Sequence, residues 1–344
     1  MTRVLFRCDG DTSVGLGHVS RCAGLAEAFD EIGIRATFYG QYNAAALCLL
    51  ESCGADVARS HVHIAGSMDD ADETLRLAAT LDAFGIVLDG YGFGEAFLEA
   101  HAEGRTGRRL MIIDDFADHD RYPRGARILN STLQAQGMTY RGDELSVFAG
   151  PEYLLVRRAL RALRATPQPP SGRSTVRCLV ALGGVDRFGR TLSVVDALAA
   201  LSTPPDVDVV LSESAPVHGR VAERLARWPS GGRLFGRLPN LADRFADSDA
   251  CITAGGLTMY EACFLGRPVA VCPQSVREAE DAAFAARAGV ALDLSAALEA
   301  GREALTEALA RFVTPRSLHA LRRALAGRFP TDPTRAAARA LTDR

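Results

Sequence analysis

The feature that most constrains the fold is a glycine-rich loop that joins an apolar run to an amphipathic stretch. The loop lies within Arg7–Arg21 and follows the apolar run Val4-Leu5-Phe6. From Val19 to Phe29, apolar residues recur at the spacing of a helix. The sequence therefore predicts a short buried strand, a glycine-rich loop and a helix, which is the opening unit of a parallel α/β sheet.

The same loop indicates a ligand site at the start of the first helix. Gly15 and Gly17 allow a ligand to approach the backbone closely, and the first turn of the helix has free N–H groups that suit an anion such as phosphate. His18 lies at or next to the helix start, where the helix dipole favours a neutral imidazole that accepts a proton. His18 is therefore a candidate general base, although a histidine here could also only cap the helix.

The loop does not fit the fingerprint of a dinucleotide-binding protein. Ser20 stands where the third glycine or alanine of that fingerprint belongs. The second predicted strand, Ala36–Tyr39, is followed by Gly40-Gln41 rather than by a ribose-binding acid. We therefore expect neither NAD nor any other cofactor.

Length and composition bound the domain count and the kind of partner. The chain has 344 residues, enough for two domains of ordinary size, and 48% hydrophobic and 24% charged residues with a net charge of -3. Without a basic excess, small molecules are expected as partners and nucleic acid is not. The first residues lack a secretory signal, and no apolar segment approaches the ~20 residues of a membrane span, so a cytoplasmic location without membrane insertion is expected.

Cysteines and histidines do not suggest a metal centre. The eight cysteines contain no Cys-x-x-Cys pair and lie among apolar residues, which is typical of reduced and buried thiols. The only close histidine pair is His61-x-His63, with no acid nearby until Asp69. We therefore expect no metal site.

A proline-rich stretch divides the chain into two halves. Residues 165–175 have neither periodicity nor apolar content, and they form the best linker candidate. The expected organisation is an N-terminal domain over 1–164, a C-terminal domain over 176–314, and C-terminal helices over 315–344 packed on the body.

Two buried runs of the first half end in acids. The runs 85–89 and 110–115 resemble strands that are covered on both faces. Ligands of open parallel sheets bind at the carboxyl ends of the strands, so the side chains there should share an edge with the Gly15–His18 loop. These side chains are Asp9, Asp89, Tyr91, Asp114 and Asp115. The alternative is that the acids cap the following turns or helices.

The second half repeats the pattern with two further glycine turns. One is Gly183-Gly184 and the other is Gly255-Gly256, which precedes Leu257 and a predicted helix. In the second turn the backbone N–H groups would meet a diphosphate, Thr258 could donate its hydroxyl, and Glu261 could accept from ribose hydroxyls. Thr258-x-x-Glu261 also matches a capping box, and spacing alone does not separate these interpretations.

Taken in order, these motifs resemble one family. They are Gly15-Leu16-Gly17-His18-Val19-x-Arg21-Cys22, Asp89-x-Tyr91, Ile113-Asp114-Asp115, Leu182-Gly183-Gly184-x-Asp186 and Ala254-Gly255-Gly256-x-Thr258-x-x-Glu261. The pattern is similar to that of the pseudaminic-acid-pathway UDP-sugar hydrolases and their spore-coat polysaccharide relatives, over most of the chain. The likeness implies a GT-B fold, in which two Rossmann-like domains face a central cleft.

The resemblance also implies roles for individual residues. His18 would activate water against C1 of a UDP-linked amino or deoxy sugar, with Asp9, Asp89 and Tyr91 as further catalytic candidates. The nucleotide diphosphate would be held by Gly255, Gly256, Thr258 and Glu261. The further candidates for ligand binding are Gly15, Gly17, Gly183, Gly184 and Leu257. The protein would act as a monomer or weak homodimer without a metal.

Three functions stay open at this point. The leading hypothesis is a nucleotide-sugar hydrolase that releases UDP with a histidine base. In a GT-B glycosyltransferase the same base would activate an acceptor hydroxyl or amine, and a base next to a diphosphate site does not separate the two. A catalytically silent nucleotide-sugar-binding protein is the third.

Overall fold

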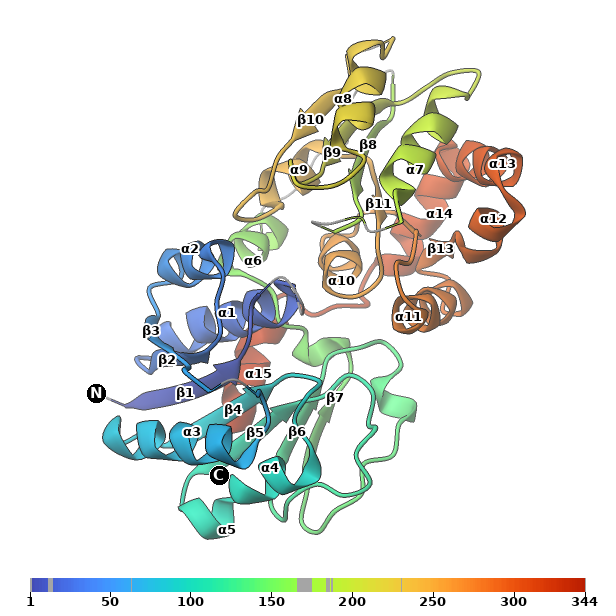
Figure 1. Cartoon of the computed structure of the whole chain (residues 1–344). Coiled ribbons are helices and arrows are strands. Elements are labelled where there is room, and N and C mark those ends of the chain that lie inside the picture. The colour runs from blue at the N-terminus through green and yellow to red at the C-terminus, as the bar shows by residue number, and fades with distance from the viewer. Residues whose placement is uncertain are drawn as a thin grey trace. The chain divides into compact units, whose positions relative to one another are not determined.

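The computed structural model describes residues 2–11, 15–62, 64–165, 175–183, 186, 188–229 and 231–343. The chain forms two compact units, one of Met1–Arg161 with Pro330–Arg344 and one of Ala162–Phe329 (Figure 1). Most of the predicted linker lies outside the described residues.

The first unit is built on a seven-stranded sheet in which all neighbouring strands are parallel. The strand order is β3-β2-β1-β4-β5-β6-β7. The strands are β1 (Arg3–Cys8), β2 (Arg35–Gly40), β3 (Asp56–Arg59), β4 (Gly85–Asp89), β5 (Arg109–Ile113), β6 (Arg127–Asn130) and β7 (Ser146–Ala149).

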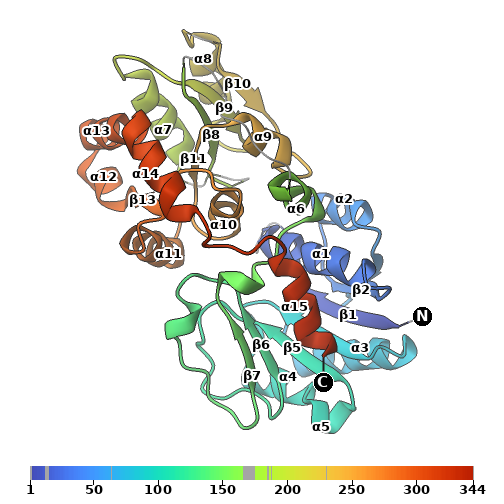
Figure 2. The same cartoon turned by 180° about the vertical axis from the view of Figure 1, so that it is seen from behind.

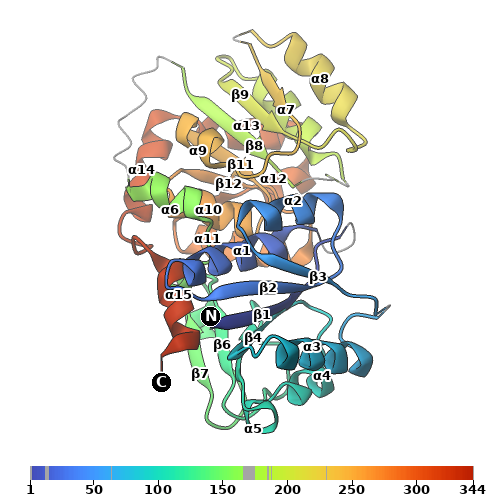
Figure 3. The same cartoon turned by 90° about the vertical axis from the view of Figure 1, so that its left-hand side faces the viewer.

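Helices cover both faces of this sheet, as Figure 3 shows. The helical elements of this unit are α1 (Gly17–Asp30), α2 (Ala44–Ser52), α3 (Met68–Thr80), α4 (Glu95–Ala100), α5 (Glu103–Thr106), α15 (Pro333–Thr342) and the 3₁₀ turns η1 (Ala135–Gly137) and η2 (Pro151–Tyr153). The first unit ends and the second begins within α6 (Arg158–Ala165). Successive side chains of β1 pack on opposite faces of the sheet, because side chains alternate along a strand. Val4 and Phe6 pack in the core beneath α1, whereas Leu5 packs in the core beside α3 and α4.

The second unit repeats the architecture with six strands, again all parallel. The order is β10-β9-β8-β11-β12-β13, from β8 (Arg177–Ala181), β9 (Asp206–Val210), β10 (Arg233–Phe235), β11 (Ala250–Thr253), β12 (Val269–Val271) and β13 (Ala291–Asp293). Its helices are α7 (Arg190–Ala199), α8 (His218–Ala226), α9 (Ala242–Asp247), α10 (Leu257–Phe264), α11 (Val276–Arg287), α12 (Ser295–Ala300), α13 (Arg302–Phe312) and α14 (Pro315–Leu325).

Both units therefore have the strand order of a Rossmann-like domain, and the predicted α/β class is confirmed. In each sheet the first strand lies in the middle and the strand order reverses beside it, at β1/β4 and at β8/β11. Ligands of open α/β sheets bind at such reversals, beyond the carboxyl ends of the strands. These two points are where the glycine-rich loops lie.

The last helix belongs to the first unit rather than to the second. α15 lies beside α1 and against β5 and β6 (Figure 2). Ala337, Ala338 and Leu341 are completely buried in the core that α1 shares. Among the described residues, no helix is both long and apolar enough to cross a membrane.

Candidate active site

The strongest candidate site lies at the β1/β4 reversal of the first sheet. α1 begins at Gly17, directly after the glycine-rich loop, so His18 stands in its first turn. Asp89 is the last residue of β4, which pairs with β1 from Val4 to Cys8. The parallel register thus brings the end of β4 next to the start of α1.

His18 and Asp89 form a buried pair. The Nδ1 atom of His18 lies 2.6 Å from Oδ1 of Asp89, and the two residues are 6% and 1% exposed. Burial alone would raise the pKa of Asp89, but the charge of Arg21 and the contacts with Arg21 and His18 lower it well below its ordinary value. A charged carboxylate only accepts hydrogen bonds, so the proton of a neutral His18 lies on Nδ1. The lone pair of Nε2 then faces away from Asp89 and can accept a proton.

Arg21 fixes this carboxylate and a second one. Its Nε and Nη2 atoms donate to the two oxygens of Asp89 over 2.7 and 2.6 Å, and Nη1 donates to Oδ2 of Asp115 over 2.5 Å. The Cys22 thiol donates a hydrogen bond to Oδ2 of Asp89 over 3.2 Å. Arg21 and Cys22 belong to the motif of the first loop and helix, but the sequence alone predicts no role for them. Their position one helical turn after His18 was the signal that could have identified them.

Tyr91 and Asp115 complete the cluster. The Tyr91 ring meets the His18 ring edge-on, with 4.5 Å between centroids, and the tyrosine is 60% exposed. Its hydroxyl donates to Oδ2 of Asp115 over 3.5 Å, which is a long hydrogen bond. The other oxygen of Asp115, Oδ1, is buried and has no hydrogen-bond partner among the residues that the structure describes.

Asp9 has a different set of partners from the one expected of a catalytic acid. Its Oδ1 atom accepts from Nη1 of Arg7 over 2.8 Å and from the backbone N–H of Gln41 over 2.7 Å. Arg7 is buried and also binds Asp70 of α3. Within the described residues, no hydrogen bond joins Asp9 to His18. The observed contacts of Asp9 connect β1 to the end of β2.

Asp114 caps the turn that follows it, as the alternative interpretation predicts. One of its oxygens accepts from the backbone N–H groups of Phe116 and Ala117, and the other accepts from the Tyr122 hydroxyl. Ligand atoms of Asp114, Asp118 and His119 lie within 4.8 Å of one another beside a cavity of about 20 Å³. This is the one group of described residues whose donors could together hold a metal ion.

The second unit places its glycine turns at the β8/β11 reversal. Gly183 follows β8 in the left-handed region, with φ of 92°, and Gly184 lies outside the described residues. Asp186 accepts from the N–H groups of Arg190 and Thr191, both over 2.9 Å. The acid of the Gly-Gly-x-Asp motif therefore occupies the amino end of α7.

The two glycines of the turn before α10 are required for different reasons. Gly256 has φ of 71° and ψ of -147°, which an L side chain rarely adopts, and it is the N-cap of α10. A Cβ on Gly255 would lie 2.6 Å from Cβ and 2.9 Å from Cα of Glu278, so close packing of α11 requires glycine there. Burial raises the pKa of Glu278, and hydrogen bonds from the Gln274 and Gly255 backbone partly oppose the rise.

Thr258 and Glu261 do not form a capping box, because the helix begins before Thr258. α10 begins at Leu257 after the N-cap Gly256, and no side chain caps it, so Thr258 and Glu261 lie inside the helix. The first backbone N–H groups of α10 have no partners within the helix. Glu261 is buried, and the hydroxyl of the buried Thr253, at the end of β11, has no hydrogen-bond partner.

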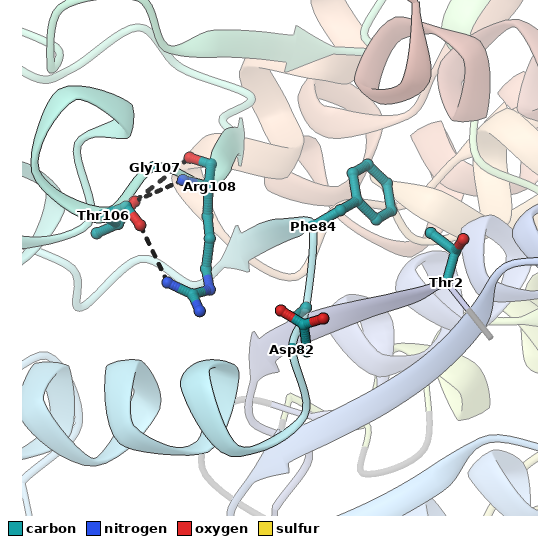
Figure 4. Close-up of a pocket in the computed structure, with 7 residues that line it drawn as sticks. Thr2, Asp82, Phe84, Thr106, Gly107 and Arg108 are labelled. Atoms are coloured by element: carbon teal, nitrogen blue, oxygen red, sulfur yellow. Dashed lines mark hydrogen bonds between the residues drawn. The ribbon is translucent and has the colours of Figure 1, made fainter.

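An open pocket lies at the opposite edge of the first sheet (Figure 4). It is formed by Thr2, Asp82, Ala83, Phe84, Thr106, Gly107 and Arg108, at the amino ends of β1, β4 and β5. Arg108 donates to the backbone oxygen of Thr106 over 3.0 Å. None of the predicted site residues lines this pocket, so it is separate from the candidate site.

Two curated proteins are similar to this chain in sequence, and no protein-family model matches it. An uncharacterized protein of Methanocaldococcus jannaschii is 24% identical over 279 residues, which cover 79% of this chain and 56% of that protein. The spore coat polysaccharide biosynthesis protein SpsG of Bacillus subtilis is 29% identical over 171 residues, covering 48% and 47%. The chain thus spans about half the length of the curated relatives it matches.

Solved structures that share the fold include glycosyltransferases. The spinosyn rhamnosyltransferase SpnG, solved with spinosyn aglycone, has a TM-score of 0.69 at 17% identity and full coverage of both chains. MurG of Acinetobacter baumannii has a TM-score of 0.65 at 13% identity, also with full coverage. The glycosyltransferase VinC, solved with dTDP, has a TM-score of 0.64 at 14% identity and full coverage. With two Rossmann-like domains and these neighbours, the chain has a GT-B fold.

Proposed function

We propose that this protein is a GT-B glycosyltransferase that uses His18 as its general base. The observation that carries the proposal is the buried His18–Asp89 pair, because it fixes the imidazole proton on Nδ1 and makes Nε2 the acceptor. The GT-B neighbours favour transfer to an acceptor over hydrolysis, since SpnG and VinC are glycosyltransferases.

In the proposed reaction each bond change has a named partner. Nε2 of His18 takes the proton from an acceptor hydroxyl or amine as that atom forms a bond to C1 of the sugar. The bond between C1 and the diphosphate oxygen breaks, and its electron pair leaves with the nucleoside diphosphate. Asp89 stabilises the imidazolium that forms, and Arg21 keeps Asp89 charged and oriented.

The donor diphosphate is assigned to the turn before α10. The first N–H groups of that helix suit an anion, and they stabilise the negative charge that develops on the leaving group. Thr258 and Glu261 remain the proposed contacts to the nucleotide, with UDP as the proposed nucleotide. Gly255 should contribute less to diphosphate binding than the sequence predicts, because its backbone already forms a hydrogen bond with Glu278.

Hydrolysis is the second candidate. It is favoured by the Gly15-x-Gly17-His18 motif and the later glycine motifs, which resemble those of UDP-sugar hydrolases. In that case water takes the place of the acceptor, and His18 has the same task.

Incubation with a panel of UDP- and dTDP-linked sugars, with and without acceptor alcohols and amines, tests the proposal. Nucleotide release that requires an acceptor, together with an acceptor whose mass rises by one sugar, is the result expected of a transferase. Release at full rate without an acceptor would identify a hydrolase. Binding without any release would leave only the silent binding protein.

A further inference from the structure

The charges around His18 do not balance when its imidazole is neutral, as the proposed general base must be before the reaction. Arg21 contributes one positive charge, whereas Asp89 and Asp115 contribute two negative charges, and each of the three residues is at most 8% exposed. Burial opposes ionisation of Arg21, but the two carboxylates raise its pKa well above the ordinary value, so it stays charged. With a neutral His18, the cluster carries one excess negative charge.

The unsatisfied atom in this cluster is Oδ1 of Asp115. Oδ2 of the same carboxylate accepts from Arg21 and Tyr91, whereas Oδ1 is buried without a partner in the described part of the chain, and the residue is only 8% exposed. A buried carboxylate oxygen without a hydrogen bond is costly, and native structures retain such a group where a ligand, water or ion satisfies it.

The aromatic groups next to Asp115 would suit a cation. The rings of Tyr91 and Phe116 lie 5.5 Å apart between centroids, and Tyr91 also meets the His18 ring. An ammonium group is attracted to aromatic faces and forms a charge-assisted hydrogen bond with a carboxylate. Tyr91 itself is 60% exposed and contacts Asp115 through a long hydrogen bond, so this edge of the cluster faces solvent.

We infer that the acceptor is a cationic amine and that Asp115 is the residue that selects it. This inference rests on the proposed function, because it names the acceptor class of the same site. The ammonium group donates to Oδ1 of Asp115 and neutralises the excess charge. It is distinct from the atom that His18 deprotonates, since an ammonium nitrogen has no lone pair with which to attack C1. The acceptor therefore carries a nucleophilic hydroxyl or second amine as well.

Direct binding of a matched pair of probes tests this inference. The pair is 2-phenylethylamine and 2-phenylethanol, which differ in the ammonium and hydroxyl groups, and affinities are measured by titration NMR in the presence of UDP. We expect the wild type to bind the amine about tenfold more tightly, which corresponds to one charge-assisted hydrogen bond. Asp115→Asn should reduce the preference to about twofold or less. Asp118→Asn, which changes an exposed neighbouring carboxylate, should retain it.

Equal affinities in the wild type, or a preference that survives Asp115→Asn, would overturn the inference. If Asp115→Asn does not fold, amide shifts of the ¹⁵N-labelled wild type replace it. The amine and not the alcohol should then shift Tyr91 and Asp115, and the absence of such shifts would count against the inference. Because no probe needs to react, a protein that transfers no sugar can still show the preference. Failure of the proposed function and failure of this inference are therefore distinguishable.

Discussion

At the scale of single residues, the site depends on one carboxylate more than on the histidine itself. Asp89 receives the His18 ring, two guanidinium nitrogens of Arg21 and the Cys22 thiol. An isolated histidine at a helix start would be free to adopt either tautomer. The position of Asp89 at the end of β4 removes that freedom, and the base therefore depends on the register between β1 and β4.

Substitution of the base itself gives the most direct prediction. His18→Asn should lower turnover by about two to four orders of magnitude, the usual contribution of a positioned general base. Nucleotide affinity should stay within about twofold of the wild-type value, because the nucleotide is assigned to the other unit. Steady-state kinetics and calorimetric titration with UDP measure the two quantities.

A second histidine provides the control for that experiment. His61→Asn changes an exposed histidine outside the cluster, and turnover should remain at the wild-type level. Near-normal turnover in a folded His18→Asn protein would remove His18 from the mechanism.

The depressed pKa of Asp89 predicts how stability depends on pH. A carboxyl group whose folded pKa lies below its unfolded value of about 3.9 stabilises the fold above that value and loses this contribution as the pH falls further. Asp89→Asn leaves the buried Arg21 without one carboxylate and should cost about 3–5 kcal/mol at pH 7. Urea unfolding between pH 7 and pH 2.5 should then show wild type and variant converging below about pH 4. A constant difference over this range would contradict the assignment.

At the scale of elements, the sequence was sufficient where one pattern has one structural solution. Apolar runs such as 85–89 and 250–253 became buried strands, and the repeated strand, glycine loop and helix produced two sheets of the same order. The carboxyl-edge rule also placed Asp89, Tyr91 and Asp115 near His18, because the ends of parallel strands lie along one edge.

Features that depend on packing between distant elements could not be predicted. The salt bridge between Arg21 and Asp115 joins residues far apart in sequence. The packing of Gly255 against Glu278 depends on where α11 lies. The capping box of Thr258 and Glu261 had the right spacing, yet a helix start two residues earlier made it irrelevant. Spacing restricts the choice of local structure, but tertiary packing decides it.

Two glycines of the same predicted type should respond differently to alanine. Gly255→Ala forces a Cβ into the backbone of α11 and should lower the free energy of unfolding by about 1–3 kcal/mol. Gly17 has open space around its Cβ position and no positive φ, so Gly17→Ala should keep or raise stability. If a ligand approaches Gly17, turnover should nevertheless fall at least about tenfold. Thermal unfolding and kinetics on both variants make the comparison, and full activity in Gly17→Ala would show that the ligand does not contact this position.

At the scale of the whole molecule, the chain returns to the unit in which it began. Residues from Pro330 onward belong with the first unit. Thr334 accepts from the backbone N–H of Val156 over 3.0 Å and donates to the oxygen of Leu154 over 2.9 Å, and Arg109 donates to the oxygen of Leu341 over 2.8 Å. The first unit therefore includes two segments that are separated in sequence by the whole second unit.

Leu341 provides the test of this arrangement, because it is completely buried in the core of the first unit although it stands near the end of the chain. Leu341→Ala should cost about 2–5 kcal/mol, the range for removing a buried leucine side chain. The exposed neighbour Arg335→Ala should change stability by less than about 0.5 kcal/mol. In hydrogen exchange read by mass spectrometry, the loss of protection should be largest in β1, β4 and β5, whereas β8 and β11 keep their wild-type protection. An equal loss in both sheets would show that the two units unfold as one, and a loss confined to the second sheet would contradict the assignment of α15 to the first.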